Sequence, residues 1–476
     1  MSTQLKSLSM SAVGRKGLSL IFILPLAVML SSAVTGTSNY LFLLVNAGII
    51  FFAILTSFPV ALLLIALASY IFPFAVGYFH LPGPMINFGY VLIVMMLLRE
   101  YFFTAGFVPI RTPINYLLIS IIAVSFLSII YGDTGAYPAF KGMLKHVSFP
   151  LLFLLILMAE PDEELMKKLV IGIILYAFLQ VVASGWQFTY YSTINPKDPG
   201  TRADLSGGLL GFSCGGHTAV LMAMTFCLVL GFILVRGFRL NLGIGLILLL
   251  IPVYLASARA GVLFFALAVP FMLLVAPLPR HGPFSKRFLV SVALFAFIVG
   301  VVQLGLGGES FRVIFNPNYA YDYSIGQSDS GMGRLQAFDI VTRELRTPLE
   351  KLVGRGPGML TPTSIVNNPN SLVAQNPVLF DNVTGYAYTT IELGFLGLAL
   401  FLLMFIQMYR FNRRFLKKID DPFWESISLG FCGLTFIFII SSIYVDAWIY
   451  YPLSFTYWGM AAALYRVGVI RGIAAQ

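Results

Sequence analysis

Long apolar stretches alternate with short polar segments along most of the chain. Each stretch is about twenty residues long, the length of a helix that crosses the hydrocarbon core of a bilayer, and short alternating runs typical of strands do not dominate. The pattern predicts membrane-spanning helices at 17–34, 40–57, 59–78, 85–103, 114–131, 143–158, 167–186, 209–233, 239–256, 259–276, 287–305, 386–408, 426–447 and 450–467.

Three of these boundaries need turns inside longer apolar stretches. Tyr40 to Phe79 is 40 residues, about 60 Å as a helix and twice the hydrocarbon thickness. The chain must therefore turn there, and residues 56–59 (Thr-Ser-Phe-Pro) are the expected place. Further turns are expected at residues 257–259 and near residues 446–452. The count is fourteen spans, or twelve to thirteen if a short early helix is re-entrant.

Two segments break the pattern of short loops, residues 187–208 and residues 307–385. The second is 79 residues without a span, and long loops are usually functional or disordered. We therefore expect a transmembrane bundle at 1–306 that includes the smaller loop, a large outward-facing loop at 307–385, and C-terminal transmembrane helices at 386–476. The expected fold class is an all-α polytopic integral membrane protein.

The large loop contains a short amphipathic helix. Residues 328–330 can cap it and Pro348 is expected to end it. The residues on its apolar face are Leu335, Phe338, Val341 and Leu345. Such a helix would fold over the outer face of the bundle.

Composition and charge support the membrane assignment. The chain is 58% hydrophobic and 11% charged, whereas soluble domains carry about 25% charged residues. With the N-terminus in the cytoplasm, 19 of the 30 Lys and Arg residues fall in cytoplasmic segments, as the positive-inside rule requires. Both termini are then cytoplasmic. The net charge of +10 is mostly an orientation signal, so nucleic-acid binding is not inferred.

The N-terminus allows two interpretations. Lys6, Arg15 and Lys16 precede the apolar stretch at 17–34, and residues 31–33 (Ser-Ser-Ala) could act as a cleavage site. That arrangement is typical of a signal peptide. A retained first helix is favoured because so many further spans follow.

Metal and cofactor chemistry finds little support in the sequence. The three cysteines and four histidines are scattered without ligand spacing, so neither a metal site nor a disulfide framework is expected. Residues 354–358 (Gly-Arg-Gly-Pro-Gly) lack the Lys-Ser/Thr ending of a phosphate-binding loop and are interpreted as a tight turn. No cofactor is predicted.

Eleven basic residues are placed on the outer side, where orientation does not explain them. Arg259 lies between two apolar spans, where an arginine is costly unless it has a partner. Arginines bind phosphate through paired hydrogen bonds, so the cluster suggests an anionic ligand such as a lipid diphosphate. The alternatives are an interfacial, snorkelling Arg259 and an ordinary loop charge at Arg334. A carboxylate of the same loop could accept a proton from a sugar hydroxyl.

Four segments, in order, resemble the superfamily of O-antigen polymerases and O-antigen ligases of the bacterial envelope. They are residues 202–212 (RADLSGGLLGF), 257–261 (SARAG), 333–358 with Gly-Arg-Leu-Gln-Ala-Phe, Thr-Pro-Leu and Gly-Arg-Gly-Pro-Gly, and 381–397 with Asp-Asn, Tyr388 and Glu-Leu-Gly-Phe-Leu-Gly. The resemblance covers roughly residues 202–405. The N-terminal half is similar only in hydropathy.

The resemblance implies glycosyl transfer at the outer face of the bacterial inner membrane, with an undecaprenyl-diphosphate-linked glycan as donor and neither metal nor nucleotide sugar. Arg202, Arg259 and Arg334 would contact the diphosphate or the glycan. Ligases of the family usually have a histidine where this chain has Asp381. That favours a polymerase of O-antigen or exopolysaccharide and suggests Asp381 as the catalytic base, although a helix-capping role fits equally. Expected partners are an acceptor glycan or lipid and a regulator of chain length.

Two other functions stay open. An O-antigen ligase would pass the glycan to a lipid A core. A flippase for lipid-linked oligosaccharides would suit the number of spans, but transporters place charged residues near the bilayer midplane on broken helices. Arginines that converge at an outer cavity would indicate transfer, and a polar cavity at the midplane would indicate transport.

Overall fold

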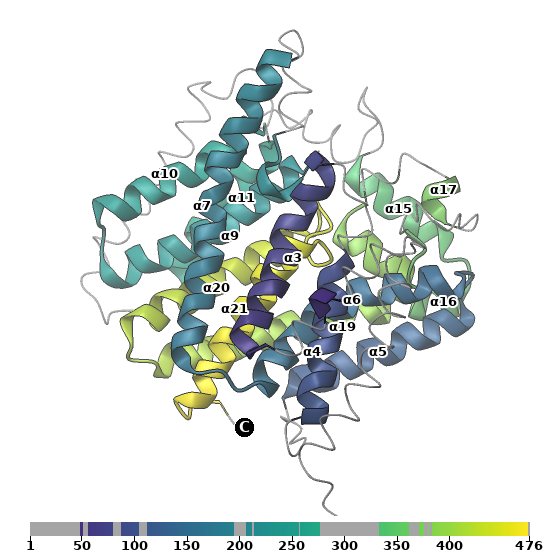
Figure 1. The fold of residues 1–476 in the computed structure, drawn as a ribbon. Coiled ribbons are helices and arrows are strands. Elements are labelled where there is room, and N and C mark those ends of the chain that lie inside the picture. The colour runs from purple at the N-terminus through teal and green to yellow at the C-terminus, as the bar shows by residue number, and fades with distance from the viewer. Residues whose placement is uncertain are drawn as a thin grey trace, which may run out of the picture.

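A computed structural model describes residues 48–50, 56–79, 87–103, 112–194, 206–211, 214–256, 258–276, 333–360, 371–375, 379 and 383–474. All regular secondary structure in these residues is helical (Figure 1). The helices are α3 (Phe58–Phe79), α4 (Phe88–Phe103), α5 (Pro113–Tyr131), α6 (Ala136–Met158), α7 (Glu163–Ile194), η2 (Gly208–Leu210), α9 (Gly215–Arg236), α10 (Leu240–Leu255), α11 (Arg259–Val275), α15 (Arg334–Glu344), α16 (Pro348–Val353), α17 (Leu372–Gln375), α19 (Gly385–Lys418), α20 (Pro422–Ser441) and α21 (Tyr451–Ile470).

Seven helices within the described residues are long and apolar enough to cross a membrane, which fits a polytopic membrane protein. The predicted turns at 56–59, 257–259 and 446–452 fall where α3 begins, where α10 gives way to α11 and where α20 connects to α21. The predicted spans 17–34 and 287–305, and most of 40–57, lie outside the described residues.

Several predicted ends were wrong. Helix α6 begins at Ala136 rather than 143, and α7 continues to Ile194, so the first part of the predicted loop 187–208 is helical. Helix α20 ends at Ser441 rather than 447. Helices α6 and α7 are longer than predicted because helical hydrogen bonding can continue into less apolar residues beyond an apolar span. Helix α20 is shorter because the chain leaves the helix for the 442–450 connection while its residues are still apolar.

Successive helices run in opposite directions, and their ends meet in two groups. At one end, the Arg471 guanidinium pairs with the Glu163 carboxylate at 2.7 Å, and the Arg236 side chain donates to the Pro422 carbonyl at 3.4 Å. At the other end, the Gly385 amide donates to the Val445 carbonyl at 3.0 Å. We call these the basic end and the loop end, because residues 333–360 lie at the second.

The described part of the large loop packs on the bundle. The Arg355 amide donates to the Ile391 carbonyl of α19 at 2.8 Å, and the Arg355 guanidinium pairs with Asp133, which follows α5, at 3.1 Å. Glycines 354, 356 and 358 have positive φ, so the predicted tight turn is present. It inserts between α5, α6 and α19.

The loop helix differs from its prediction at both ends. Gly333 caps α15, and the predicted cap at 328–330 lies outside the described residues. Pro348 does not end this helix; it is the first residue of α16, where Thr347 and Glu350 form a capping box. Proline is favoured at a first helical position because it needs no hydrogen-bond acceptor there. Val341 and Leu345 are buried as predicted, but the Leu335 side chain is exposed.

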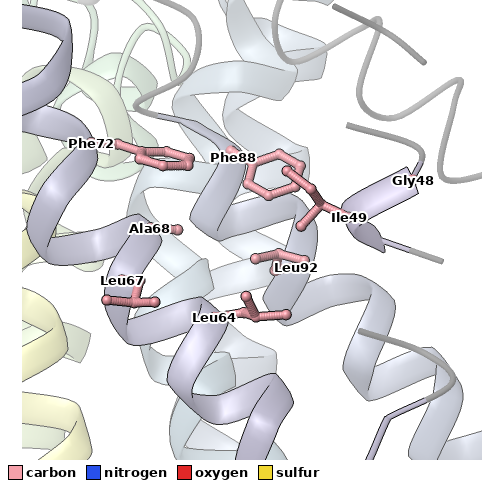
Figure 2. A pocket seen from close by; sticks show the side chains of 8 residues that line it. All are labelled: Gly48, Ile49, Leu64, Leu67, Ala68, Phe72, Phe88 and Leu92. Carbon is pink, nitrogen blue, oxygen red and sulfur yellow. The ribbon is translucent and has the colours of Figure 1, made fainter. Parts of the chain in front are cut away.

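Helices α3 and α4 enclose an apolar pocket with residues 48 and 49. Figure 2 shows its lining, which includes Leu64 and Phe72 of α3 and Phe88 of α4. The pocket has a volume of about 390 Å³, and all of its lining residues are apolar. It can therefore receive a hydrocarbon chain but offers no charged group to a polar ligand.

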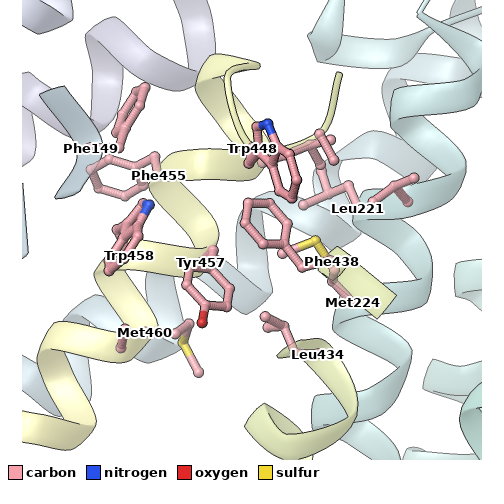
Figure 3. Packing of buried hydrophobic residues seen from close by; sticks show 14 of the residues in the cluster. Phe149, Leu221, Met224, Leu434, Phe438, Trp448, Phe455, Tyr457, Trp458 and Met460 are labelled. Carbon is pink, nitrogen blue, oxygen red and sulfur yellow. The ribbon is translucent and has the colours of Figure 1, made fainter. Parts of the chain in front are cut away.

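The middle of the bundle is packed with aromatic side chains from α19, α20, α21 and the connection between the last two (Figure 3). The rings of Phe438 and Tyr457 stack at 4.4 Å, and Trp448 stacks on Phe405 at 5.4 Å. Stacked and edge-to-face rings add to the burial of apolar surface. This packing fixes the 442–450 connection against the bundle.

Helix α19 breaks at Gly394, where φ is 69°. A Cβ atom at this position would lie 2.2 Å from the Leu352 carbonyl oxygen of α16. The break frees the carbonyls of Ile391 and Glu392 from the helix, and they accept from the Arg355 amide and the Ser128 hydroxyl. Glycine is required here both by the backbone conformation and by the contact with α16.

We therefore expect Gly394→Ala to destabilise the protein by at least about 1–3 kcal/mol, the cost of a strained backbone position, before the clash with α16 is added. Thermal unfolding of the purified protein in detergent measures this. Gly172→Ala in α7 is the control, because a Cβ there meets nothing within 4 Å. A Gly394 variant as stable as the control would contradict the role of the break.

Candidate functional site

Arg334 is the predicted site residue whose side chain the structure describes. It is the first residue of α15 at the loop end, and its guanidinium lies 5.2 Å from the centre of the Tyr444 ring. Tyr444 belongs to the 442–450 connection, and its ring also contacts Phe264 of α11 at 6.2 Å. A cation at a helix N-terminus is electrostatically unfavourable. The position of Arg334 is therefore not explained by the stability of α15.

The other three predicted residues are placed only in part or not at all. Helix α11 begins at Arg259, at the loop end, although the Arg259 side chain is not among those described. Arg202 and Asp381 lie outside the described residues. What the structure brings together is the second turn of α11 and the first turn of α15, through Phe264, Tyr444 and Arg334.

A buried pair joins α6 to the break in α19. His146 Nε2 lies 2.9 Å from Glu392 Oε2, and both side chains are fully buried. The second carboxylate oxygen accepts from the Leu360 amide at 3.1 Å. Glu392 therefore holds the end of the glycine turn as well as α6. Ionisable groups inside a membrane protein are costly unless they are paired. A buried pair such as this one therefore has a structural or a functional role.

A second pair lies at the start of α9. His217 Nε2 and Asp446 Oδ1 are 2.5 Å apart, and the His217 ring stacks obliquely on the Tyr450 ring at 4.0 Å. Burial alone would raise the pKa of the Asp446 carboxyl. The charge and the hydrogen bond of His217 outweigh burial, so the pKa lies below its usual value. Unlike the first pair, this one is partly exposed, by 19% for His217 and 30% for Asp446.

Lys145 connects the two pairs. Its ammonium donates to the Tyr388 hydroxyl at 3.3 Å and interacts electrostatically with both Glu392 and Asp446. Lys141 lies one turn earlier on α6 and is also buried, with 8% of its surface exposed. Both lysines belong to the outward basic residues that orientation does not explain, and they add cationic groups at the loop end.

The two histidine pairs were missed by sequence reasoning. Ligand spacing is judged between residues close in sequence, whereas 246 residues separate His146 from Glu392 and 229 separate His217 from Asp446. The readable signal was the ionisable pair Lys145-His146 inside an apolar span, where each such residue is a candidate for function. Among the described residues, no group of three or more His, Cys, Asp and Glu side chains could hold a metal ion.

A scan against models of known protein families finds no match to this chain, and a search of curated proteins finds no relative. The site must therefore be interpreted from its chemistry. Three cationic side chains and two histidine–carboxylate pairs gather at one end of the bundle. Cations can bind an anionic group and a partly exposed histidine can accept a proton.

Proposed function

We propose that this protein transfers a glycan from undecaprenyl diphosphate to a sugar hydroxyl, in the polymerisation of O-antigen or exopolysaccharide. The observation that supports the proposal best is the gathering of Arg334, Lys145 and Lys141 at the loop end, in a chain whose helices otherwise carry few charges. A diphosphate is a good leaving group, so such an enzyme needs mainly to stabilise charge and to position the acceptor.

The orientation in the membrane follows from charge. Basic residues are dense at the basic end, which includes Lys167, Lys168, Arg236, Arg239, Arg410, Arg413, Arg414, Lys417, Lys418, Arg466 and Arg471. By the positive-inside rule this end faces the cytoplasm, the loop end faces outward, and both termini are cytoplasmic. The apolar pocket between α3 and α4 would receive part of the polyprenyl chain (Figure 2).

The residues divide between two tasks in this proposal. Arg334 and Arg259, with Arg202, would hold the diphosphate, and Lys145 would add a positive charge nearby. Asp381, at the return of the large loop, would serve as a base for the acceptor hydroxyl. The capping role expected as its alternative belongs to Thr384, the N-cap of α19, whose side chain accepts from the Ala387 amide. A ligase would use the same groups and differ only in its acceptor.

Transport of a lipid-linked oligosaccharide is the second candidate. It is favoured by the break of α19 at Gly394 beside the buried His146–Glu392 pair, since transporters use interrupted helices with polar groups near the midplane. Transport and transfer predict different lipid intermediates.

A strain that lacks this protein should lose its surface polymer if the proposal is correct. Loss of a polymerase leaves single repeat units on lipid or core, whereas loss of a ligase leaves full-length polymer on undecaprenyl diphosphate. Loss of a flippase leaves the lipid-linked unit on the cytoplasmic face. Mass spectrometry of extracted lipids and electrophoresis of surface glycans distinguish these outcomes. Normal polymer without any intermediate would contradict the proposal.

A further inference from the structure

The His217–Asp446 pair has the geometry of a proton-accepting dyad. Asp446 Oδ1 lies 2.5 Å from His217 Nε2, and the His217 side chain also forms a hydrogen bond with Cys214. A proton from a substrate would go to Nδ1, the nitrogen that does not face Asp446. A carboxylate in this position orients the imidazole and stabilises it once it is protonated. The Tyr450 ring, tilted by 31° against the imidazole and held by its hydroxyl donating to the Leu210 carbonyl, limits rotation of the His217 ring.

Exposure separates this pair from the other one. His146 and Glu392 are fully buried, whereas 19% of the His217 side chain and 30% of the Asp446 side chain are exposed. A substrate hydroxyl can therefore approach His217 but not His146. Of the two histidine–carboxylate pairs in the described residues, His217–Asp446 is the one suited to chemistry.

The dyad also lies beside the arginine that is proposed to hold phosphate. The Arg334 guanidinium lies 5.2 Å from the centre of the ring of Tyr444, which is two residues before Asp446. Gly216, next to His217, packs on the same residue, since a Cβ there would lie 3.2 Å from the Tyr444 ring. The start of α9 and the start of α15 thus meet on either side of the 444–446 segment, with Lys145 in electrostatic range of Asp446.

We propose that His217 is the general base that deprotonates the acceptor hydroxyl, with Asp446 as its positioning residue. The inference rests on the proposed glycosyl transfer and assigns the base to His217 in place of Asp381, at a position that the motif resemblance does not include. The acceptor oxygen forms a bond to the anomeric carbon of the donor glycan as the bond from that carbon to the diphosphate breaks. The electron pair leaves with undecaprenyl diphosphate, and the hydroxyl proton goes to His217.

The test uses the purified full-length protein in nanodiscs, with lipid-linked glycan extracted from cells that lack the protein as both donor and acceptor. His217→Gln should lower the rate of transfer by about 10²–10⁴-fold and remove the acid limb of the pH–rate profile. Asp446→Asn should lower the rate less and remove the acid limb only in part. Asp446→Glu should restore part of the rate. Binding of fluorescent undecaprenyl diphosphate should stay within about two-fold, since charge recognition belongs to the arginines.

The pH–rate profile also takes account of the other ionisable groups near the dyad. Cys214 precedes His217 on its own segment, Tyr450 faces the ring, and Lys145 and Tyr90 interact with Asp446. These groups shift the pH at which the acid limb lies, but they do not remove the limb. Asp162→Asn, an exposed cap of α7 at the basic end, is the matched control and should leave both rate and profile unchanged.

The outcomes separate this inference from the proposed function. Transfer by the unmodified protein with an unchanged rate and profile in His217→Gln would overturn the base and leave the proposed function standing. An unmodified protein whose pH profile has no acid limb would do the same, even if the variants failed to fold. Absence of transfer by the unmodified protein, although it binds undecaprenyl diphosphate, would overturn both.

Discussion

Replacing Glu392 with alanine should lower the free energy of unfolding by at least about 1–3 kcal/mol, the usual cost of leaving a buried hydrogen-bonding group without its partner. The substitution leaves His146 without its partner in a fully buried position. It also removes the acceptor of the Leu360 amide, so the glycine turn loses its bond to α19. Three elements, α6, α19 and the turn, are loosened by one change.

Thermal unfolding of the purified variant in detergent measures this loss. Glu164→Ala is the matched control, because that carboxylate forms an exposed i,i+4 pair with Lys168 at 2.8 Å and such pairs contribute about 0.5 kcal/mol or less. The double variant His146→Leu with Glu392→Leu should recover the part of the stability that belongs to the pair, since well-packed apolar residues often replace a buried pair without cost. The Leu360 amide stays without its acceptor in this variant. If Glu392→Ala unfolded like the control, the pair would not hold these elements together.

Hydropathy predicted the spans because a bilayer imposes a fixed length on an apolar helix. It failed where a helix continues into polar residues. Helix α6 begins at Ala136, and its first turns carry Pro138 and Lys141, which lower hydropathy although both are buried. Pro138 lies against the glycine turn at Gly358. That burial depends on residues more than 200 positions later, which no local window contains.

The candidate site also contains residues that local sequence features indicate and residues that they do not. Arg334 was found because a local feature, the amphipathic helix behind it, marks its position in the loop. His146 and His217 were dismissed because their carboxylate partners lie on α19 and in the 442–450 connection. Pairing across a helix bundle is decided by tertiary packing, and a single sequence does not reveal it. The start of α16 was also missed, since Pro348 was predicted to end a helix, although Thr347 and Glu350 have the spacing of a capping box.

In the proposed glycosyl transfer, Arg334→Ala should reduce the rate by about 10²–10³-fold, the usual cost of removing one group that stabilises developing charge. The leaving diphosphate gains negative charge as its bond to the sugar breaks, and a fixed guanidinium binds it through two parallel hydrogen bonds. Arg334→Lys should retain only part of the rate, because an ammonium keeps the charge but loses the paired geometry. Initial rates in nanodiscs measure both variants.

Loss of activity in Arg334→Ala must be distinguished from loss of folding. The position of the residue allows the two effects to be separated. Its cation lies at the start of α15, against the helix dipole, and its guanidinium rests on the Tyr444 ring. A cation–π contact of this kind contributes about 0.5–1 kcal/mol at an exposed site, so the melting temperature should fall only slightly. Arg343→Ala on the same helix is the control, since its exposed side chain pairs with Asp339 at 2.6 Å. Both variants should fold, and only Arg334→Ala should lose transfer. Equal rates in the two would remove Arg334 from the proposed diphosphate site and leave Arg202 and Arg259, with Lys145, as the groups proposed to bind the ligand.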